Sequence, residues 1–430
     1  MPKDPREKAE KYVNKGHRYY DAESYKKAGK YFNSAGELYY ELHEFEKAEE
    51  YFFNSANSFI NDDRYDDVIE NLRYAGDSAV FLNDFLKAYK YFKVGMKYIP
   101  RLKSKRDKDF NYVLFSSLAH LCLFIKGKQD QGIKMIKEIK KHIDSAYFRE
   151  NPLIILVKNL TIAIRDKNEG YLDEVEKNFE KYKFRDAEEK LMKEVLVVAK
   201  THISLKTSLI FDKEQYTTNE LVDLKLEIDT NPLTSISNHP FYEYKIEELK
   251  ISDVGISLSD NLITQKKPTL PVKLSPGEVY PMEFVIRPNF QVDNTFVGPL
   301  LLTCEIDEKF IFFLKTQSVK LNLISPPPSL EVSTKNLKTP LIGKSFPMEI
   351  LVQNLSEGEA FSIEIEMEMP EQLKLMRGNQ KKQIYALRPN EEMSWEVSLQ
   401  PKEAGDYEIT FKMTFNDPDQ NQIEQGKVFP

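Results

Sequence analysis

A repeat of twenty residues is the feature that most restricts how this chain can fold. Aromatic residues stand twenty positions apart at Tyr25, Phe45, Tyr65 and Phe85. Three positions after each comes Ala or Val, seven after it Phe or Leu, and ten or eleven after it a small residue. These positions lie on one face of an α-helix. Each period therefore predicts a helix of roughly 16–18 residues and a tight turn, and two periods predict an antiparallel hairpin.

Large rings alternate with Ala and Gly on that face, so each helix can seat its rings in gaps left by its neighbours. Polar breaks between the repeats offer Ser, Asn and Asp as helix N-caps. The face lacks the converging polar groups that a ligand pocket needs, which favours core packing for its aromatic residues. The first half of the chain is therefore expected to form a stack of helices, an α-solenoid.

The sequence changes character near residue 205, after which Thr, Val and Ile alternate with polar residues and most of the 22 prolines occur. Residues 221–229 (LVDLKLEID) alternate as a half-buried strand does. Two sets of predicted strands are related by an offset of 113 residues, because 274–278 (LSPGE) recurs as 387–391 (LRPNE). In each copy, proline presets a turn before a strand. This repetition predicts a duplicated β-sandwich.

Residues 403–407 (EAGDY) resemble the tyrosine corner of immunoglobulin-like folds, with Ile409 where antibody domains have a cysteine. Trp395 is expected in the core of its sandwich, and the prolines at 326–328 are expected to form a stiff spacer. The predicted fold is multidomain α + β. It consists of a right-handed α-solenoid over residues 1–205, followed by tandem immunoglobulin-like β-sandwiches over 206–325 and 329–430.

The 430 residues include 61 Lys and Arg, 68 Asp and Glu, and two cysteines, Cys122 and Cys304. The cysteines lie in different predicted domains, so a reducing compartment is favoured over a disulfide framework, and there is no CxxC metal or redox motif. No secretory leader is expected, and the apolar runs fall short of the roughly 20 residues that span a bilayer. The expected location is the cytoplasm, with peripheral membrane contact as a further prospect.

Motifs that carry catalysis are missing from the sequence, which holds no phosphate-binding glycine loop, no HExxH and no GxSxG elbow. The six histidines are scattered, with no pair three or four positions apart. We therefore expect no enzyme activity, no cofactor and no metal ion. An enzyme with an unrecognised site is one alternative, and a carbohydrate- or cell-surface-binding protein built on immunoglobulin-like domains is another.

The charge is unevenly distributed along the chain. Residues 81–160 carry 17 basic and 7 acidic side chains, a net charge of +10, although the whole chain has a net charge of -7. Such a segment could bind an acidic helical bundle or an anionic membrane, unless it is simply a solvated loop and an amphipathic helix. Nucleic acid is not expected, because no recognition motif accompanies the lysines. The candidate binding residues are Arg101, Lys103, Lys105, Arg106, Lys108, Lys126, Lys128, Lys134, Lys137, Lys140 and Lys141.

The helical half also resembles a known family. Its Ala-x-x-Tyr-Phe-x-x-Ala rhythm at a period of 20, in place of the 34 of ordinary tetratricopeptide repeats, is similar to the soluble NSF attachment proteins (SNAPs). Residues 111–127, 130–143, 147–165 and 171–202 follow the order of helices in the C-terminal half of that family. The resemblance implies an adaptor that holds SNARE bundles, with a AAA ATPase as a second partner.

The chain departs from that family in ways that bear on these partners. The solenoid is shorter, and Ile203 to Leu205 run into β-sequence, whereas the family's ATPase contacts a free C-terminal leucine pair. The family's apolar membrane loop has no counterpart beyond Tyr19 and Tyr20. The expected function is a non-catalytic adaptor or scaffold in SNARE-like or vesicle-trafficking assembly. The alternative is a generic tetratricopeptide scaffold, or a tethering subunit of the TRAPP or coat type, that binds partners through its β-sandwiches, for example by edge-strand addition.

Overall fold

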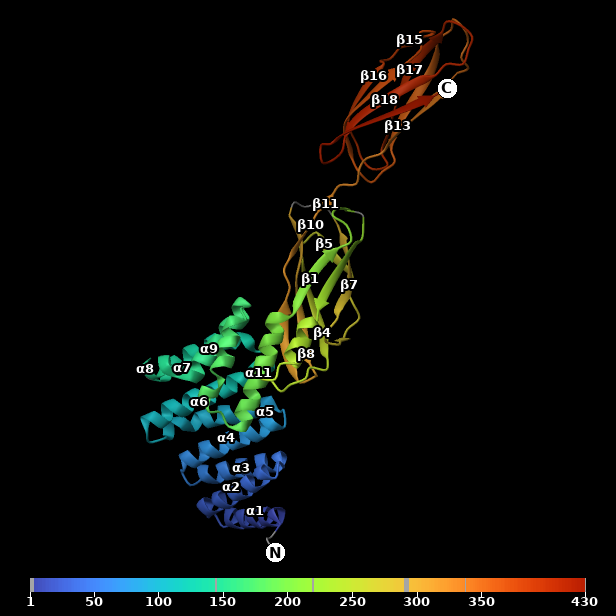
Figure 1. The fold of residues 1–430 in the computed structure, drawn as a ribbon. Coiled ribbons are helices and arrows are strands. Elements are labelled where there is room, and N and C mark those ends of the chain that lie inside the picture. Colours follow the sequence, from blue (N-terminus) through green and yellow to red (C-terminus); the bar gives the residue numbers. More distant parts are fainter. Residues whose placement is uncertain (1–3, 144, 219, 290–293, 337, 430) are drawn as a thin grey trace.

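The computed structural model describes residues 4–143, 145–218, 220–289, 294–336 and 338–429. A helical half is followed by a first and a second β-sandwich (Figure 1), which confirms the predicted order of a helical region and antiparallel sheets. Met1 and Pro430, the outer limits of the predicted domains, lie outside the described residues. The helices of the helical half are α1 (Pro5–Asp21), α2 (Tyr25–Glu41), α3 (Phe45–Ile60), α4 (Tyr65–Phe81), α5 (Phe85–Tyr98), η1 (Ile99–Arg101), α6 (Lys105–Ile125), η2 (Gln129–Gln131), α7 (Gly132–His142), α8 (Ser145–Glu150), α9 (Pro152–Asp166), α10 (Gly170–Lys177), η3 (Phe179–Tyr182) and α11 (Asp186–Ser204).

The repeat fixes both the starts of the helices and the turns between them. α2, α3, α4 and α5 begin at the four repeated aromatic residues. Each helix before them ends in a turn that contains one residue with positive φ, between 53° and 60°. A left-handed residue stops a helix because its carbonyl and amide groups no longer follow the helical path. These residues also recur every twenty positions, at Glu23, His43, Asp63 and Asn83.

Rings and glycines pack as their alternation in the sequence predicts. A Cβ atom added to Gly76 would lie 2.5 Å from the ring of Phe92 in the next helix, and one added to Gly95 would lie closer still to Phe115. Both aromatic residues are fully buried. The ring of one helix thus fills the space over the glycine of the helix before it, and successive helices approach closely.

The last helix leaves the stack. α11 packs across α4 and α6 and then continues into the first strand of the first sandwich. Arg73 on α4 donates from Nε to the carboxylate of Glu188 on α11 at 2.6 Å. α6 packs against both α7 and α11, which lie to the left and right in Figure 1. One face of the solenoid is therefore covered by the protein's own chain.

Each sandwich consists of two sheets, and the strand orders of the two sandwiches correspond. The orders are β1-β3-β7-β5 and β10-β8-β4-β6, with β9 also paired to β8, in the first sandwich, and β12-β13-β17-β15 and β16-β14-β18-β19 in the second. The short strands β2 and β11 pair in parallel, and helix α12 (Asn231–Ser237) follows β3. The strands of the first sandwich are β1 (Lys206–Phe211), β2 (Tyr216–Thr217), β3 (Val222–Asp229), β4 (Leu249–Leu258), β5 (Leu262–Lys266), β6 (Val272–Leu274), β7 (Val279–Pro288), β8 (Thr295–Ile306), β9 (Phe310–Lys315), β10 (Val319–Leu321) and β11 (Leu323–Ile324). Those of the second sandwich are β12 (Leu330–Asn336), β13 (Phe346–Asn354), β14 (Ala360–Glu368), β15 (Leu373–Arg377), β16 (Lys381–Leu387), β17 (Glu392–Pro401), β18 (Ile409–Asn416) and β19 (Gln422–Phe429).

The repeated Leu-x-Pro-x-Glu motif makes the same turn in both sandwiches. In the first, the N–H groups of Gly277 and Thr230 close two hydrogen bonds between the motif and the end of β3, at 3.2 and 2.9 Å. In the second, the N–H groups of Asn390 and Asn354 do the same at the end of β13, both at 3.0 Å. Gly277 and Asn390 both have positive φ. The motif therefore ties corresponding strands together at the same point of each sandwich.

Three details of the strand half can be compared with their predictions. The hydroxyl of Tyr407 donates to the backbone carbonyl of Glu403 at 2.6 Å, as a tyrosine corner does. Trp395 packs against the core of the second sandwich but is only half-buried, because it lies toward the start of β17, before the fully buried Val397. The alternation of residues 319–324 (VKLNLI) predicts one strand, but the structure splits it into β10 and β11, since the chain passes there from β8 to β2.

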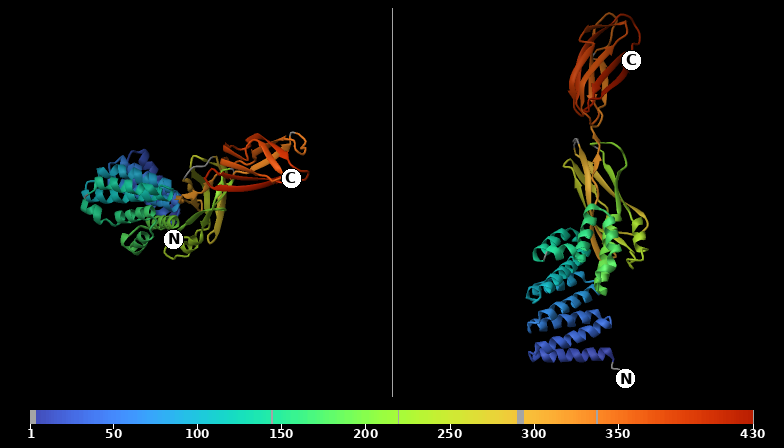
Figure 2. Two further views of the ribbon diagram at one scale, coloured as in Figure 1. Left: turned by 90° about the horizontal axis from the view of Figure 1, so that it is seen from above. Right: turned by 60° about the vertical axis from the view of Figure 1, so that its left-hand side comes forward.

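One hydrophobic core runs through the helical half and the first sandwich, from Ala9 to Leu323, and includes the free thiols Cys122 and Cys304. The second sandwich has a core of its own. The two views of Figure 2 show it beyond the first sandwich, joined by the proline segment. None of the described helices is both long enough and apolar enough to cross a membrane.

Candidate partner-binding site

The basic residues singled out from the sequence fall on three segments of the helical half. They are Arg101 at the end of η1 with Lys103, Lys105, Arg106 and Lys108 around the start of α6, Lys126 and Lys128 in the turn after α6, and Lys134, Lys137, Lys140 and Lys141 on α7. The rings of Tyr112 on α6 and His142 on α7 have centroids 4.7 Å apart. The basic end of α7 therefore lies beside the first turns of α6, so the structure brings two of the three segments together.

Acidic neighbours neutralise part of this charge. The ammonium of Lys105 lies 3.4 Å from the carboxylate of Asp109, one turn further along α6. On α7, Lys141 pairs with Glu138 at 2.7 Å, and this contact lowers the pKa of Glu138. Both pairs are largely exposed on the lysine side, so they are weak and leave the surface basic.

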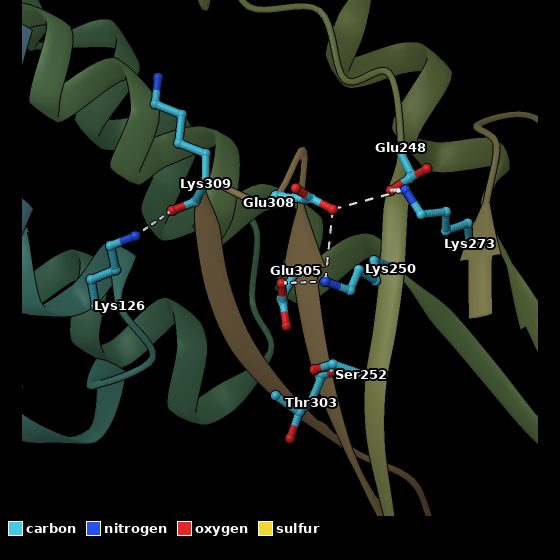
Figure 3. Close-up of polar contacts among 9 residues, drawn as sticks. All are labelled: Lys126, Glu248, Lys250, Ser252, Lys273, Thr303, Glu305, Glu308 and Lys309. Carbon is cyan, nitrogen blue, oxygen red and sulfur yellow. Dashed lines mark hydrogen bonds and ion pairs between the residues drawn. The ribbon is translucent and has the colours of Figure 1, made fainter. Parts of the chain in front are cut away.

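Lys126 lies apart from the other candidates. Its ammonium donates to the backbone carbonyl of Lys309, just before β9, at 2.8 Å (Figure 3). The same ammonium lies 5.7 Å from the centre of the Phe85 ring, and burial lowers the pKa of Lys126. Lys126 therefore holds the helical half to the first sandwich instead of facing a partner.

Lys126 belongs to a row of contacts that closes the free edge of β9. The backbone carbonyls of residues 309, 311 and 313 lie, in order, 2.8 Å from Nζ of Lys126, 3.0 Å from Nε2 of Gln129 and 2.9 Å from Nε2 of His202. Edge strands expose unpaired carbonyl and N–H groups that invite pairing with another chain. In the first sandwich, side chains of the helical half occupy this edge.

Figure 3 also shows a ladder of ion pairs on the sheet next to this joint. Lys250 lies 3.2 Å from Glu305 and 3.8 Å from Glu308, and Lys273 lies 3.0 Å from Glu248. These pairs bridge neighbouring strands and stabilise the sheet. Because these lysines and glutamates bind one another, the ladder stabilises the sheet and is not our candidate for binding a partner.

A groove of about 290 Å³ lies between α5, α6 and α7, and it is the best candidate for binding a partner. Its floor is a single line of residues on α6, spaced four, three and four positions apart: Tyr112, Ser116, Ala119 and Leu123. Its walls come from α5, with Tyr89, Lys93 and Met96, and from η2 and α7, with Gln131, Lys134, Met135 and Glu138. The middle of the floor carries the small side chains, so the groove is deepest there.

The groove arises where the twenty-residue repeat stops. α6 has 21 residues, but α7 has only 11 and begins after η2. Gln129 in η2 is held by the carbonyls of Phe124 and Ile311, which ties the start of α7 to the sandwich. α7 thus does not cover α6 in the way that each repeat helix covers the one before it.

Both walls of the groove are rich in lysine. α5 contains four lysines and no acidic residue, and α7 contains four lysines and one glutamate. Lys93 and Lys134 are exposed on the groove, and neither forms an ion pair among the described residues. Lys134 is among the residues predicted from the sequence but Lys93 is not, because the lysines of α5 are spread along the helix and form no cluster in the sequence. Counting charges helix by helix would have identified α5.

His120 lines the groove from below but does not add to its charge. Its side chain is buried, and burial lowers the pKa of His120 to about 4, so the ring is neutral at pH 7. Within the described part of the chain, no group of three or more His, Cys, Asp and Glu side chains is arranged to hold a metal ion.

Comparison with known proteins leaves the family of this chain unassigned. No family model matches the sequence, and no curated protein matches it. Among solved structures, the chain is similar to the adhesin InvE of Yersinia pseudotuberculosis, with 11% identity and a TM-score of 0.20 over 52% of this chain and 60% of that one. It is also similar to red sea bream transglutaminase, with 10% identity and a TM-score of 0.21 over 57% of this chain and 34% of that one. The chain thus spans less than two thirds of either protein, and TM-scores this low carry no argument about function.

Proposed function

We propose that the protein is a non-catalytic adaptor that binds protein partners through the basic side of its helical solenoid. The observation that carries this proposal is the difference between two parts of α6. Part of α6 is covered by the protein's own α11, whereas the line of residues from Tyr112 to Leu123 lies in the lysine-lined groove. A partner with acidic surface helices would be attracted to the groove.

The resemblance of the repeats to SNAPs adds a candidate for that partner, a SNARE-like helical bundle in vesicle or membrane traffic at the cytoplasmic side. A AAA ATPase is a second candidate, but it would need a surface other than the one used in SNAPs, because α11 runs into β1 and Leu205 is buried. Tyr20 is 39% exposed and is the residue of the first hairpin that we propose for peripheral membrane contact.

The test is a pulldown with a purified acidic four-helix SNARE-type bundle as bait, at about 50 and about 300 mM salt. We expect binding at low salt that weakens at high salt, and loss of binding when Lys93, Lys134 and Lys137 are all changed to Glu. A matched variant with Lys103, Lys105 and Arg106 changed to Glu should bind more strongly than the first. Binding that is equally strong at both salt concentrations, and equally strong in wild type and in the first variant, would contradict the proposal.

The second sandwich supports a different candidate function, a scaffold that adds a partner's strand to its own sheet. β19 occupies the place in the second sandwich that β9 occupies in the first, and in the described residues it pairs only with β18. The outer edge of β19 therefore exposes backbone N–H and C=O groups, whereas the corresponding edge of β9 is covered by side chains of the helical half. Glu424→Pro would block this edge, because the N–H of Asp417 donates to the carbonyl of Asn421 and the alternation along β18 and β19 then directs the N–H of residue 424 outward. Reduced capture of extended peptides by that variant, with capture by the solenoid unchanged, would support the scaffold function.

A further inference from the structure

We infer that the groove between α5 and α7 seats one acidic amphipathic helix of a partner protein. This inference rests on the proposed function, since it names the class of segment that the basic side of the solenoid would bind. It rests on the shape of the groove, on its apolar lining and on the charge of its rim.

The shape suits a helix. The floor residues Tyr112, Ser116, Ala119 and Leu123 form one straight stripe over twelve residues of α6. At 1.5 Å for each of the eleven steps, this stripe is about 16 Å long, which matches about three turns of a bound helix. Walls on both sides confine the occupant to a direction along α6, as in complexes where a helix lies in a groove.

The lining suits apolar side chains at helical spacing. Tyr112 and Leu123 are half-buried at the two ends of the floor, and the small Ser116 and Ala119 leave room between them. Met96 on α5 and Met135 on α7 also line the groove. Methionine adapts its shape to different partners, which favours insertion of a large apolar residue at the centre.

The rim suits negative charge. Lys93 and Lys134 stand on opposite walls. Lys90 and Lys97 on α5 and Lys137 and Lys140 on α7 add positive charge along both helices, while Lys87 is paired with Glu49. The acidic member of the rim, Glu138, is paired with Lys141. A helix with apolar residues on one face and glutamates on its flanks would place its carboxylates next to both walls.

The α11 helix shows how this solenoid binds a helix elsewhere. There, Glu188 of α11 accepts a hydrogen bond from Arg73 of α4, and at the sandwich end Glu194 of α11 lies 2.5 Å from Lys309, which belongs to the first sandwich. The chain thus already holds an amphipathic helix by an apolar face and by carboxylates set against basic residues. The groove offers the same combination to an external helix.

The experiment measures fluorescence anisotropy of a labelled synthetic peptide of about three turns, with Leu at positions i, i+4 and i+7 and Glu and Ala elsewhere. The full chain should bind it, and a peptide with Lys in place of Glu should bind at least about tenfold more weakly at low salt. Lys93→Glu combined with Lys134→Glu should weaken binding of the acidic peptide by about tenfold or more, while Lys103→Glu combined with Lys105→Glu should have a smaller effect.

A second variant tests the shape of the groove. Ser116→Phe fills the centre of the floor and should abolish insertion, whereas Ile155→Phe on α9, where Ile155 is 42% exposed, should leave binding unchanged. If Ser116→Phe lowers the helical circular dichroism signal, the variant is misfolded, and the inference is then tested by the charge variants alone. Failure of the acidic peptide to bind, or equal binding by the Lys93 and Lys134 variant, overturns the inference. Because the bundle pulldown uses the whole basic surface, a bundle that binds while the peptide does not would leave the adaptor function standing and exclude this groove.

Discussion

Asp77 provides a direct test of how α11 is held on the solenoid. It is fully buried on α4, and its Oδ2 atom lies 3.4 Å from the guanidinium of Arg185. In the described residues its Oδ1 atom has no hydrogen-bond partner. Arg73, the other nearby cation, is bonded to Glu188 at 2.6 Å. Two carboxylates therefore share two arginines, and the closer contact belongs to Glu188.

Burial, reinforced by the charge of Glu188, raises the pKa of Asp77 to about 7, against the opposing effect of Arg73 and Arg185. The folded protein thus holds this proton at pH values where the unfolded chain has released it. Stability from this group is fully present below the unfolded pKa and is lost as pH rises toward 7. Above the folded pKa no further change is expected.

The variant Asp77→Asn keeps the shape of the side chain and removes its titration. At about 1.4 kcal/mol per pKa unit, the wild-type helical half should lose about 2 kcal/mol relative to Asp77→Asn between about pH 5.5 and about pH 8. Because the charges of Glu188, Arg73 and Arg185 all act on Asp77, this figure is an upper bound, and a difference of about 1–2 kcal/mol is expected. Asp66→Asn, which changes an exposed carboxylate on the same helix, should show no such difference.

The assay is urea unfolding followed by two signals. Far-ultraviolet circular dichroism reports the helical half, and the fluorescence of Trp395, the one tryptophan of the chain, reports the second sandwich, which has a separate core. Only the first signal should respond to Asp77→Asn. If the difference between wild type and Asp77→Asn stays constant with pH, or reverses in sign, then Arg185 holds Asp77 ionised and the reasoning is wrong.

Three further predictions concern other parts of the chain. Gly95→Ala places a Cβ atom against the ring of Phe115 and should destabilise the helical half by about 1–3 kcal/mol in the circular dichroism assay. Gly255→Ala should not, because its Cβ atom would lie at an ordinary contact distance of 3.9 Å from Leu301. Tyr407→Phe removes the hydrogen bond to residue 403 and should lower the stability of the second sandwich by about 1 kcal/mol in the fluorescence assay, with the helical signal unchanged as the control. Burial lowers the pKa of His120 to about 4, so the unfolded chain binds a proton below about pH 6.5 that the folded protein does not, and acid lowers the free energy of unfolding. His120→Leu removes this effect, and the variant should lose about 2 kcal/mol less stability in the helical half than wild type between about pH 7.5 and about pH 5. An equal loss of stability in both proteins would refute this.

Local patterns were sufficient to predict the elements of the fold. The aromatic period predicted where α2 to α5 begin, because the spacing of rings and small residues is itself the contact pattern between successive helices. The repeated proline motif predicted corresponding turns in the two sandwiches, because proline and a residue with positive φ determine the local backbone.

Contacts between distant segments were not predictable in the same way. The ammonium of Lys126 binds a carbonyl 183 positions away, and no local pattern distinguishes it from the exposed Lys128 two residues later. The return of α11 across α4 likewise depends on Glu188 meeting Arg73, a pairing 115 positions apart. The groove was not predicted because it forms where the twenty-residue repeat is interrupted. There, α7 has only 11 residues, and the hydrogen bond of Gln129 to the carbonyl of residue 311 holds its start to the first sandwich.

The route of α11 also determines where this solenoid can change its length. At the end next to the first sandwich, α11 lies across the stack, and Lys126 and Gln129 after α6 form hydrogen bonds with backbone carbonyls at β9. An additional helical hairpin inserted there would separate these residues. At the other end, in the described residues, α1 packs on α2 and lies far from the joint (Figure 1). Duplication or loss of a twenty-residue unit near α1 would lengthen or shorten the arm while the joint, the groove and the direction of both sandwiches stayed the same. Evolution or design can therefore adjust the reach of this protein from one end without rebuilding the other.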